Sequence, residues 1–198
     1  MNRVVTADGQ PIKGDVVVVA DESTPEAAAG VLYVVGAAAL VDPLAVRLEL
    51  DAMFDALRKR PFHWVNEGVT AKQRIVDVIT AAGVVAVANV RQVGRRGQVA
   101  ARDDMVRLVA EFSANEGATH LMIEASDQVT MSRDQTVLLD HHRDKGGAPF
   151  AYDWRTKNES LLWIADAVAG AAADWVTGKN VEWHDQLYDS GALTVRYV

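Results

Sequence analysis

The sequence predicts an α/β domain with a mixed, mainly parallel β-sheet and helices on both of its faces. Apolar, β-branched runs alternate with stretches of helical periodicity along the 198 residues, which is typical of a sheet covered by helices. Hydrophobic residues make up 49% of the chain, enough to fill one core in a domain of this size. We therefore expect a single domain over 1–198, with 176–198 as a C-terminal extension.

Two apolar runs near the start predict an antiparallel hairpin. Val16–Ala20 is an uninterrupted apolar run, as expected for a strand that is buried on both faces. It ends at Asp21-Glu22, shortly before Pro25, which cannot donate to a sheet ladder. A second apolar run covers 31–40, and the short polar link between the two runs favours antiparallel pairing.

The rest of the chain alternates helices and strands. Asp42 and Pro43 provide an N-cap and a first-turn proline for a helix that extends towards Pro61. Periodic apolar residues predict further helices over about 70–82, 100–115, 132–143 and 159–175. Apolar runs predict strands over about 84–90, 119–124 and 150–154. The aromatic and polar tail, 176–198, is compatible with a hairpin or an edge strand.

Composition excludes several classes of site. The chain has no cysteine, so disulfides, thiolate nucleophiles and cysteine-based zinc sites are excluded. The formal net charge is −7, which argues against a plain nucleic-acid-binding module, although a local basic patch or bound metal ions can dominate at a site. No Gly-x-Gly-x-x-Gly loop, Walker-type loop or Gly-x-Ser-x-Gly elbow occurs. With no signal-peptide pattern and no apolar run long enough to span a bilayer, we expect a cytoplasmic protein without a membrane partner.

Acidic residues stand at two strand ends and inside one apolar helix. Asp21 and Glu22 end the first strand, and Glu124 ends a later strand, with Asp127 just beyond it. Asp166 interrupts the apolar helix segment 161–169, where an unpaired buried charge would be costly. Two or three carboxylates are enough to hold Mg²⁺, and two such ions about 4 Å apart could clamp the oxygens of a phosphodiester.

Each of these residues also has a structural interpretation. An Asp-Glu-Ser triplet after a strand is often a turn, and a glutamate at a strand end is often solvated. His63, in a connector beside Trp64, is a better metal candidate than His141-His142, because adjacent residues of a helix point in different directions. A lone loop histidine is nevertheless more often structural.

Several short motifs, in this order, resemble a large bacterial and phage family known as domain of unknown function 3800. The first is Asp21-Glu22-Ser23 after an apolar strand, followed by the strand segment Val34-Val35-Gly36-Ala37. Phe62-His63-Trp64 before a helix is similar to the middle segment of that family. The late helix segment 161–170, Leu-Leu-Trp-Ile-Ala-Asp-Ala-Val-Ala-Gly, completes the resemblance, which covers about residues 15–173.

The resemblance implies an RNase H-like fold with a metal-dependent nuclease-type site. Asp21 would match the first-strand carboxylate and Asp166 the last-helix carboxylate. In such a sheet the strand beside the first one usually carries a middle carboxylate. By order, the run 84–90 matches that strand, but it offers Asn89 and no acid, whereas Glu124 and Asp127 follow one strand later. Glu67 is another possible donor.

These observations lead to one functional hypothesis and one alternative. The hypothesis is a Mg²⁺- or Mn²⁺-dependent nuclease or phosphodiesterase that acts on nucleic acid, with a water activated by the metal as the nucleophile. The expected catalytic residues are Asp21, Glu22, Glu124 and Asp166, and the expected metal ligands are Asp21, Glu124, Asp127 and Asp166. The alternative is a non-catalytic interaction or regulatory module that pairs with itself or with another protein. Its aromatic tail, Trp175, Trp183 and Tyr188, would serve that pairing or would simply complete the core.

Overall fold

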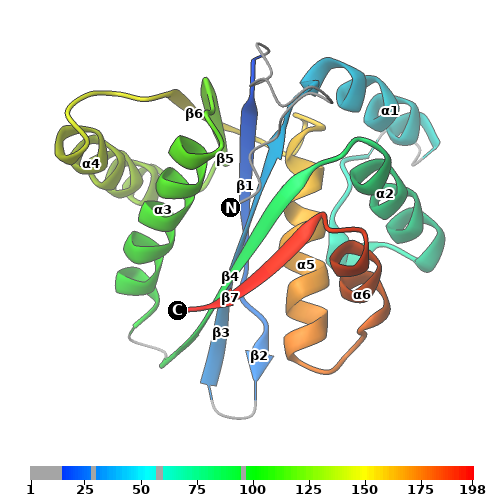
Figure 1. Ribbon diagram of the computed structural model, residues 1–198. Helices are drawn as coiled ribbons and strands as arrows, with labels where there is room; N and C mark the ends of the chain where they lie inside the picture. Colours follow the sequence, from blue (N-terminus) through cyan, green and yellow to red (C-terminus); the bar gives the residue numbers. More distant parts are fainter. Residues whose placement is uncertain (1–14, 28–29, 57–59, 95–96) are drawn as a thin grey trace.

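One mixed sheet lies between two layers of helices in the computed structural model, which describes residues 15–27, 30–56, 60–94 and 97–198. The strand order is β6-β5-β1-β3-β4-β7, and the short β2 pairs with β3 (Figure 1). The strands are β1 (Val17–Ser23), β2 (Glu26–Ala27), β3 (Gly30–Leu40), β4 (Val85–Val93), β5 (His120–Glu124), β6 (Ala151–Arg155) and β7 (Leu193–Tyr197). The helices are α1 (Pro43–Ala56), η1 (Trp64–Asn66), α2 (Val69–Ala81), α3 (Gln98–Asn115), α4 (Gln128–Asp144), α5 (Leu162–Val176) and α6 (Glu182–Asp189).

The expected hairpin is confirmed, because β1 pairs antiparallel with β3 and Asp21 lies opposite Gly36. Strand β4 then pairs antiparallel with β3. On the other side of β1, strands β5 and β6 continue the sheet in parallel. The mixed α/β architecture predicted from the sequence is therefore the observed one, although the sheet is not mainly parallel: β3 pairs antiparallel with β1, β2 and β4.

The expected neighbour of the first strand is wrong. We expected 84–90 to lie beside it, but β4 extends the sheet on the far side of β3, and β5 is the strand that pairs with β1. The order of strands along a chain does not fix the edge of the sheet at which each strand is added. As a result, Glu124 at the end of β5 lies on the strand directly beside β1.

The two faces of the sheet have separate cores. Helices α1, α2, α5 and α6 cover one face, and α3 and α4 cover the other (Figure 1). Along β1, Val17 and Val19 belong to the core beneath α5, whereas Val18 and Ala20 belong to the core beneath α3. Successive strand residues point to opposite faces, so Asp21 must face the α5 side.

Helix α5 is buried from Leu162 to Asp174 and crosses the sheet at close range. Gly36 of β3 permits this approach, because a Cβ atom there would lie 2.7 Å from both the Ala165 carbonyl oxygen and the Ala169 amide nitrogen. The close contact brings Asp166, one residue after Ala165, to the level of the end of β1.

The C-terminal extension completes the core and the sheet. It forms α6 and the edge strand β7, which pairs parallel with β4. Trp183 is buried and packs edge-on against Trp64, with ring centroids 6.3 Å apart. It therefore belongs to the core and not to a docking surface, whereas Tyr188 is 61% exposed. No helix in the described segments combines the length and the apolar character that crossing a membrane requires.

Candidate functional site

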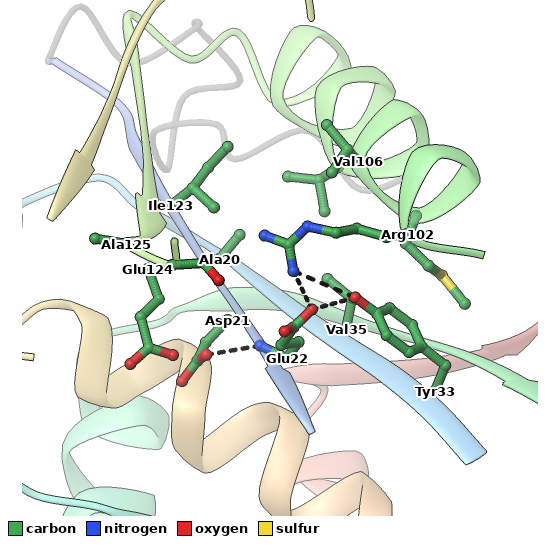
Figure 2. Close-up of a pocket in the computed structure, with 13 residues that line it drawn as sticks. Ala20, Asp21, Glu22, Tyr33, Val35, Arg102, Val106, Ile123, Glu124 and Ala125 are labelled. Atoms are coloured by element: carbon green, nitrogen blue, oxygen red, sulfur yellow. Dashed lines mark hydrogen bonds and ion pairs between the residues drawn. The ribbon is translucent and has the colours of Figure 1, made fainter. Parts of the chain in front are cut away.

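Three carboxylates from three elements meet around one lysine. Lys157 Nζ lies 3.2 Å from Asp21 Oδ2 at the end of β1, 3.7 Å from Glu124 Oε1 at the end of β5, and 2.9 Å from Asp166 Oδ1 on α5. Asp21 and Asp166 are buried. Figure 2 shows Asp21 and Glu124 pointing to the same side of β1. The structure thus brings together three of the acidic residues that the sequence indicated.

Two of these carboxylates have one oxygen held by a backbone amide and the other turned to the lysine. Asp21 Oδ1 accepts a hydrogen bond from the Glu22 amide at 2.7 Å, and Asp166 Oδ2 accepts one from the Trp64 amide at 2.7 Å. Asp21 Oδ2 is buried and accepts no hydrogen bond, although Lys157 lies within ion-pair distance. The site therefore contains oxygen lone pairs that the protein itself does not fully satisfy.

Lys157 was not anticipated from the sequence. It lies in the turn between β6 and α5, and the Trp163 indole N–H donates to its carbonyl oxygen at 2.8 Å. A lysine in a polar loop carries no pattern that reveals where its side chain will end, because that depends on how the loop crosses the sheet. The only indication in the sequence was that Asp166, in an apolar helix, needed a partner for its charge.

His63 lies at the rim of the carboxylate cluster and is 48% exposed. Its Nδ1 atom is 3.0 Å from Lys157 Nζ and 3.4 Å from Asp166. An ammonium group can only donate hydrogen bonds and a carboxylate can only accept them, so Nδ1 can bond to Lys157 as an acceptor or to Asp166 as a donor, but not to both at once. His63, which the sequence offered as a metal candidate, thus lies beside the acidic cluster.

The electrostatics of the cluster oppose full ionisation. Burial raises the pKa of Asp21 well above its usual value, and the neighbouring carboxyl groups of Glu124 and Asp166 raise it further, while Lys157 opposes them. Burial alone would lower the pKa of Lys157, but the charges of Asp21, Asp166 and Glu124 outweigh it and raise that pKa. One ammonium is thus insufficient to balance three carboxylates.

Asp21→Asn is expected to stabilise the metal-free protein increasingly as pH rises. The raised pKa means that the folded state keeps the Asp21 proton at pH values where the unfolded chain releases it. Above the ordinary value of 3.8, the group therefore lowers the free energy of unfolding as pH increases. Asparagine does not titrate, so the free energy of unfolding of the variant should exceed that of the wild type by a margin that grows from about pH 4 upwards. Urea unfolding in EDTA at several pH values measures this difference, and a pH-independent difference would contradict the burial of an ionisable Asp21.

Glu22, expected to be catalytic, faces the other side of the sheet. Figure 2 shows it directed towards Arg102 of α3 and the Tyr33 hydroxyl, both of which bond to Glu22. Arg102 in turn donates to both carboxylate oxygens of the buried Asp134, at 2.9 and 2.8 Å. A mainly apolar cavity of about 150 Å³ lies beside this network, between β1 and α3. Alternation along β1 accounts for the separation of Glu22 from Asp21.

Two other candidate donors have structural partners. Asp127, expected as a metal ligand, is the N-cap of α4: it accepts from the amides of Val129 and Thr130, and the Thr130 hydroxyl and these amides lower its pKa. Glu67 binds the guanidinium of Arg60 through both of its oxygens. Neither contact involves Lys157.

Trp64 lies along a polar stripe of α5. Its amide donates to Asp166, its indole ring lies over Gly170, and its indole N–H donates to Asp174 Oδ2 at 2.9 Å. Lys72 lies over the same ring, 4.5 Å from its centroid, and 3.6 Å from Asp174. The spacing of Asp166, Gly170 and Asp174 by one helical turn each explains why these residues interrupt an apolar helix.

An open groove of about 540 Å³ leads to the cluster along α5. Its walls include Pro25, His63, Trp64, Asp166 and Lys179. The cluster is therefore reachable from solvent on the side of His63.

The spacing of the cluster differs from that of a closed metal site. Within the described segments, no three His, Cys, Asp or Glu side chains are spaced as the ligands of a single ion. The distances from Lys157 Nζ to the carboxylates, 2.9–3.7 Å, exceed the roughly 2.0–2.6 Å of Mg²⁺–oxygen and Ca²⁺–oxygen bonds. The carboxylates would have to move inwards to hold a divalent ion.

Comparison with known proteins provides a structural likeness. No protein-family model matches the sequence, and no curated protein sequence matches it either. A solved structure of the PCNA:RNase HII complex from Archaeoglobus fulgidus is similar, with a TM-score of 0.50 and 11% identity over 87% of this chain and 78% of that chain. At this identity the likeness concerns the fold alone. The chain therefore has an RNase H-like α/β fold, with its carboxylate cluster at the ends of β1 and β5.

Proposed function

We propose that the protein is a divalent-metal-dependent phosphodiesterase of the nuclease type, with Asp21, Glu124 and Asp166 as ligands of Mg²⁺ or Mn²⁺. The observation that supports this most directly is the convergence of Asp21 Oδ2, Glu124 Oε1 and Asp166 Oδ1 on one point. Oxygen atoms are the ligands that Mg²⁺ prefers, and two or three carboxylates are sufficient because the ion keeps several waters.

The residues present fit such an ion in their chemistry. Asp21 Oδ2 is buried without a hydrogen-bond partner, and burial first, then the neighbouring carboxyl groups, raise the pKa of Asp21. A bound divalent ion would satisfy this oxygen and balance the charge, and it would polarise a phosphoryl oxygen and activate water as a nucleophile. The backbone amides of Glu22 and Trp64 would hold the carboxylates in place.

The groove along α5 is the proposed path for the substrate. It ends at Asp166 and His63 and carries Lys179 at its other end. A phosphodiester backbone that followed it would approach the carboxylates from the side of His63. The RNase H-like fold and the resemblance to the domain-of-unknown-function family are consistent with a nucleic-acid substrate.

Asp21→Asn is expected to abolish cleavage and to leave the fold intact. The assay would offer single- and double-stranded DNA, RNA and RNA–DNA hybrids with Mg²⁺ or Mn²⁺, and with EDTA as the metal-free reference. Asparagine keeps the shape of the side chain but loses the charge that attracts the metal, so a loss of at least 100-fold, on the order of an essential catalytic group, is expected.

Asp127→Asn is the matched control, because asparagine is an equally good N-cap and Asp127 lies outside the cluster. It should retain the wild-type rate. Cleavage that persists in EDTA or in Asp21→Asn would refute the proposal, and a wild-type protein inactive on every substrate would leave the non-catalytic interaction module as the better explanation.

A further inference from the structure

We propose that Lys157 is a built-in counter-ion that occupies the cation position of the carboxylate cluster, and that a divalent metal must displace it to bind. This inference rests on the proposed metal site but concerns how that site is regulated. Its central observation is geometric: one ammonium nitrogen lies within 3.7 Å of all three carboxylates.

Lys157 Nζ and a metal ion shared by the three carboxylates would need the same position. In Asp21 and Asp166, a backbone amide binds one carboxylate oxygen. The other oxygen of each carboxylate faces Lys157. A metal ion shared by these three carboxylates would need the same oxygens. Its centre would therefore fall where Nζ now lies, and the two cations cannot occupy that position together.

Lys157 is held in this position by the surrounding structure. The Trp163 indole fixes its carbonyl oxygen. The turn that follows is fastened to α1 by the Ser160 hydroxyl, which donates to Asp51 at 2.9 Å, and by Glu159, which pairs with Arg47 at 2.8 Å. The lysine side chain is only 15% exposed. A surface lysine that met the cluster by chance would lack this support.

A divalent ion suits the cluster better in charge than Lys157 does, and the lysine has room to leave. One monovalent ammonium faces three carboxylates, and a divalent ion balances more of their charge. The backbone at residue 157 is fixed, but the lysine side chain has four methylene groups joined by rotatable bonds. The ammonium, which already contacts His63, can therefore swing past it into the open groove while the loop stays in place. In that position it would be available to an incoming phosphate.

The test compares Mn²⁺ binding to the full-length wild type, Lys157→Met and Lys157→Arg by isothermal titration. Methionine keeps the length of the side chain and removes the charge, so Lys157→Met should bind Mn²⁺ at least about tenfold more tightly. Lys157→Arg keeps the charge and should bind like the wild type or more weakly. Lys145→Met, which removes an exposed lysine at the C-cap of α4 instead, should leave the affinity unchanged.

Thermal unfolding gives a readout that is independent of activity. Without metal, Lys157→Met should unfold at a lower temperature than the wild type, because three carboxylates lose their cation. Added Mn²⁺ should raise its unfolding temperature by more than it raises that of the wild type.

The wild type itself provides a test that does not depend on any variant folding. An amine-reactive ester, followed by mass spectrometry, should label Lys157 faster in Mn²⁺ than in EDTA, and Lys179 at the same rate in both. Unchanged labelling of Lys157, or Mn²⁺ affinity that is no higher in Lys157→Met, overturns the inference. Displacement of Lys157 without any nuclease activity would retain this inference and refute the proposed function.

Discussion

Gly170→Ala is expected to destabilise the protein by roughly 3 kcal/mol, at the upper end of what overpacking a core usually costs. A Cβ atom at this position would lie 2.8 Å from Trp64 Cβ and closer still to two atoms of the indole ring. Trp64 is buried against Phe62, Trp183 and α5, so the indole can move aside only by giving up these packing contacts. For a chain of this length the loss corresponds to a fall in melting temperature of about 6–12 °C.

Packing and helix propensity predict opposite changes in the stability of Gly170→Ala. Alanine in a helix interior is favoured over glycine by roughly 0.5–1 kcal/mol, so propensity alone predicts a more stable variant. Gly94→Ala is the control, because nothing lies within 4 Å of its added Cβ and its backbone is unstrained. Calorimetry on both variants distinguishes these two predictions. A Gly170→Ala protein as stable as the wild type would show that the indole is not confined.

The same substitution should disturb the carboxylate cluster. The Trp64 amide donates to Asp166 Oδ2, so an indole pushed away from α5 pulls on the residue that orients Asp166. Gly170 thus connects the packing of α5 with the geometry of the candidate site, although it is one helical turn away from Asp166.

Much of the fold could be predicted because its strands are uninterrupted apolar runs. The hairpin of β1 and β3 follows from two such runs and a short link, and the alternation of helices and strands follows from periodicity. The placement of β5 beside β1 did not follow, since sequence order leaves open the edge at which a strand joins. That error made Glu124 appear one strand too far from Asp21.

The candidate site could be predicted only in part, for the same reason. Asp21 and Asp166 interrupt apolar segments, and a buried carboxylate signals a partner. Glu22 was grouped with Asp21 although the period of two along a strand already places them on opposite faces. Asp127 precedes a helix that begins at Gln128, earlier than expected, and aspartate is a typical N-cap. Lys157 depends on the path of a loop in space, which no local pattern encodes.

Arg102→Met is expected to destabilise the protein by about 3–5 kcal/mol, the range for removing one partner of a buried ion pair. Arg102 is the cation that Asp134 binds through both oxygens, and the Asp134 side chain is fully buried. Methionine fills much of the same space but cannot donate hydrogen bonds, so the Asp134 charge would remain in the core without compensation. Urea unfolding at neutral pH measures the loss.

A matched control distinguishes burial from charge alone. Arg133 binds Asp103 on the same pair of helices with similar two-bond geometry, but its side chain is 47% exposed. Exposed ion pairs contribute little, so Arg133→Met should leave the free energy of unfolding almost unchanged. Equal losses in the two variants would mean that the number of ion pairs between α3 and α4 matters and that the burial of Asp134 does not.

A double variant tests the cause itself. If the loss comes from the orphaned carboxylate, Arg102→Met with Asp134→Leu should recover much of it, because a buried ion pair can be replaced by apolar residues at little cost. Glu22 and Tyr33 would lose Arg102 in both variants. A deficit that persists in the double variant would therefore assign the stabilising role of Arg102 to Glu22, Tyr33 and the end of β1, next to the carboxylate cluster.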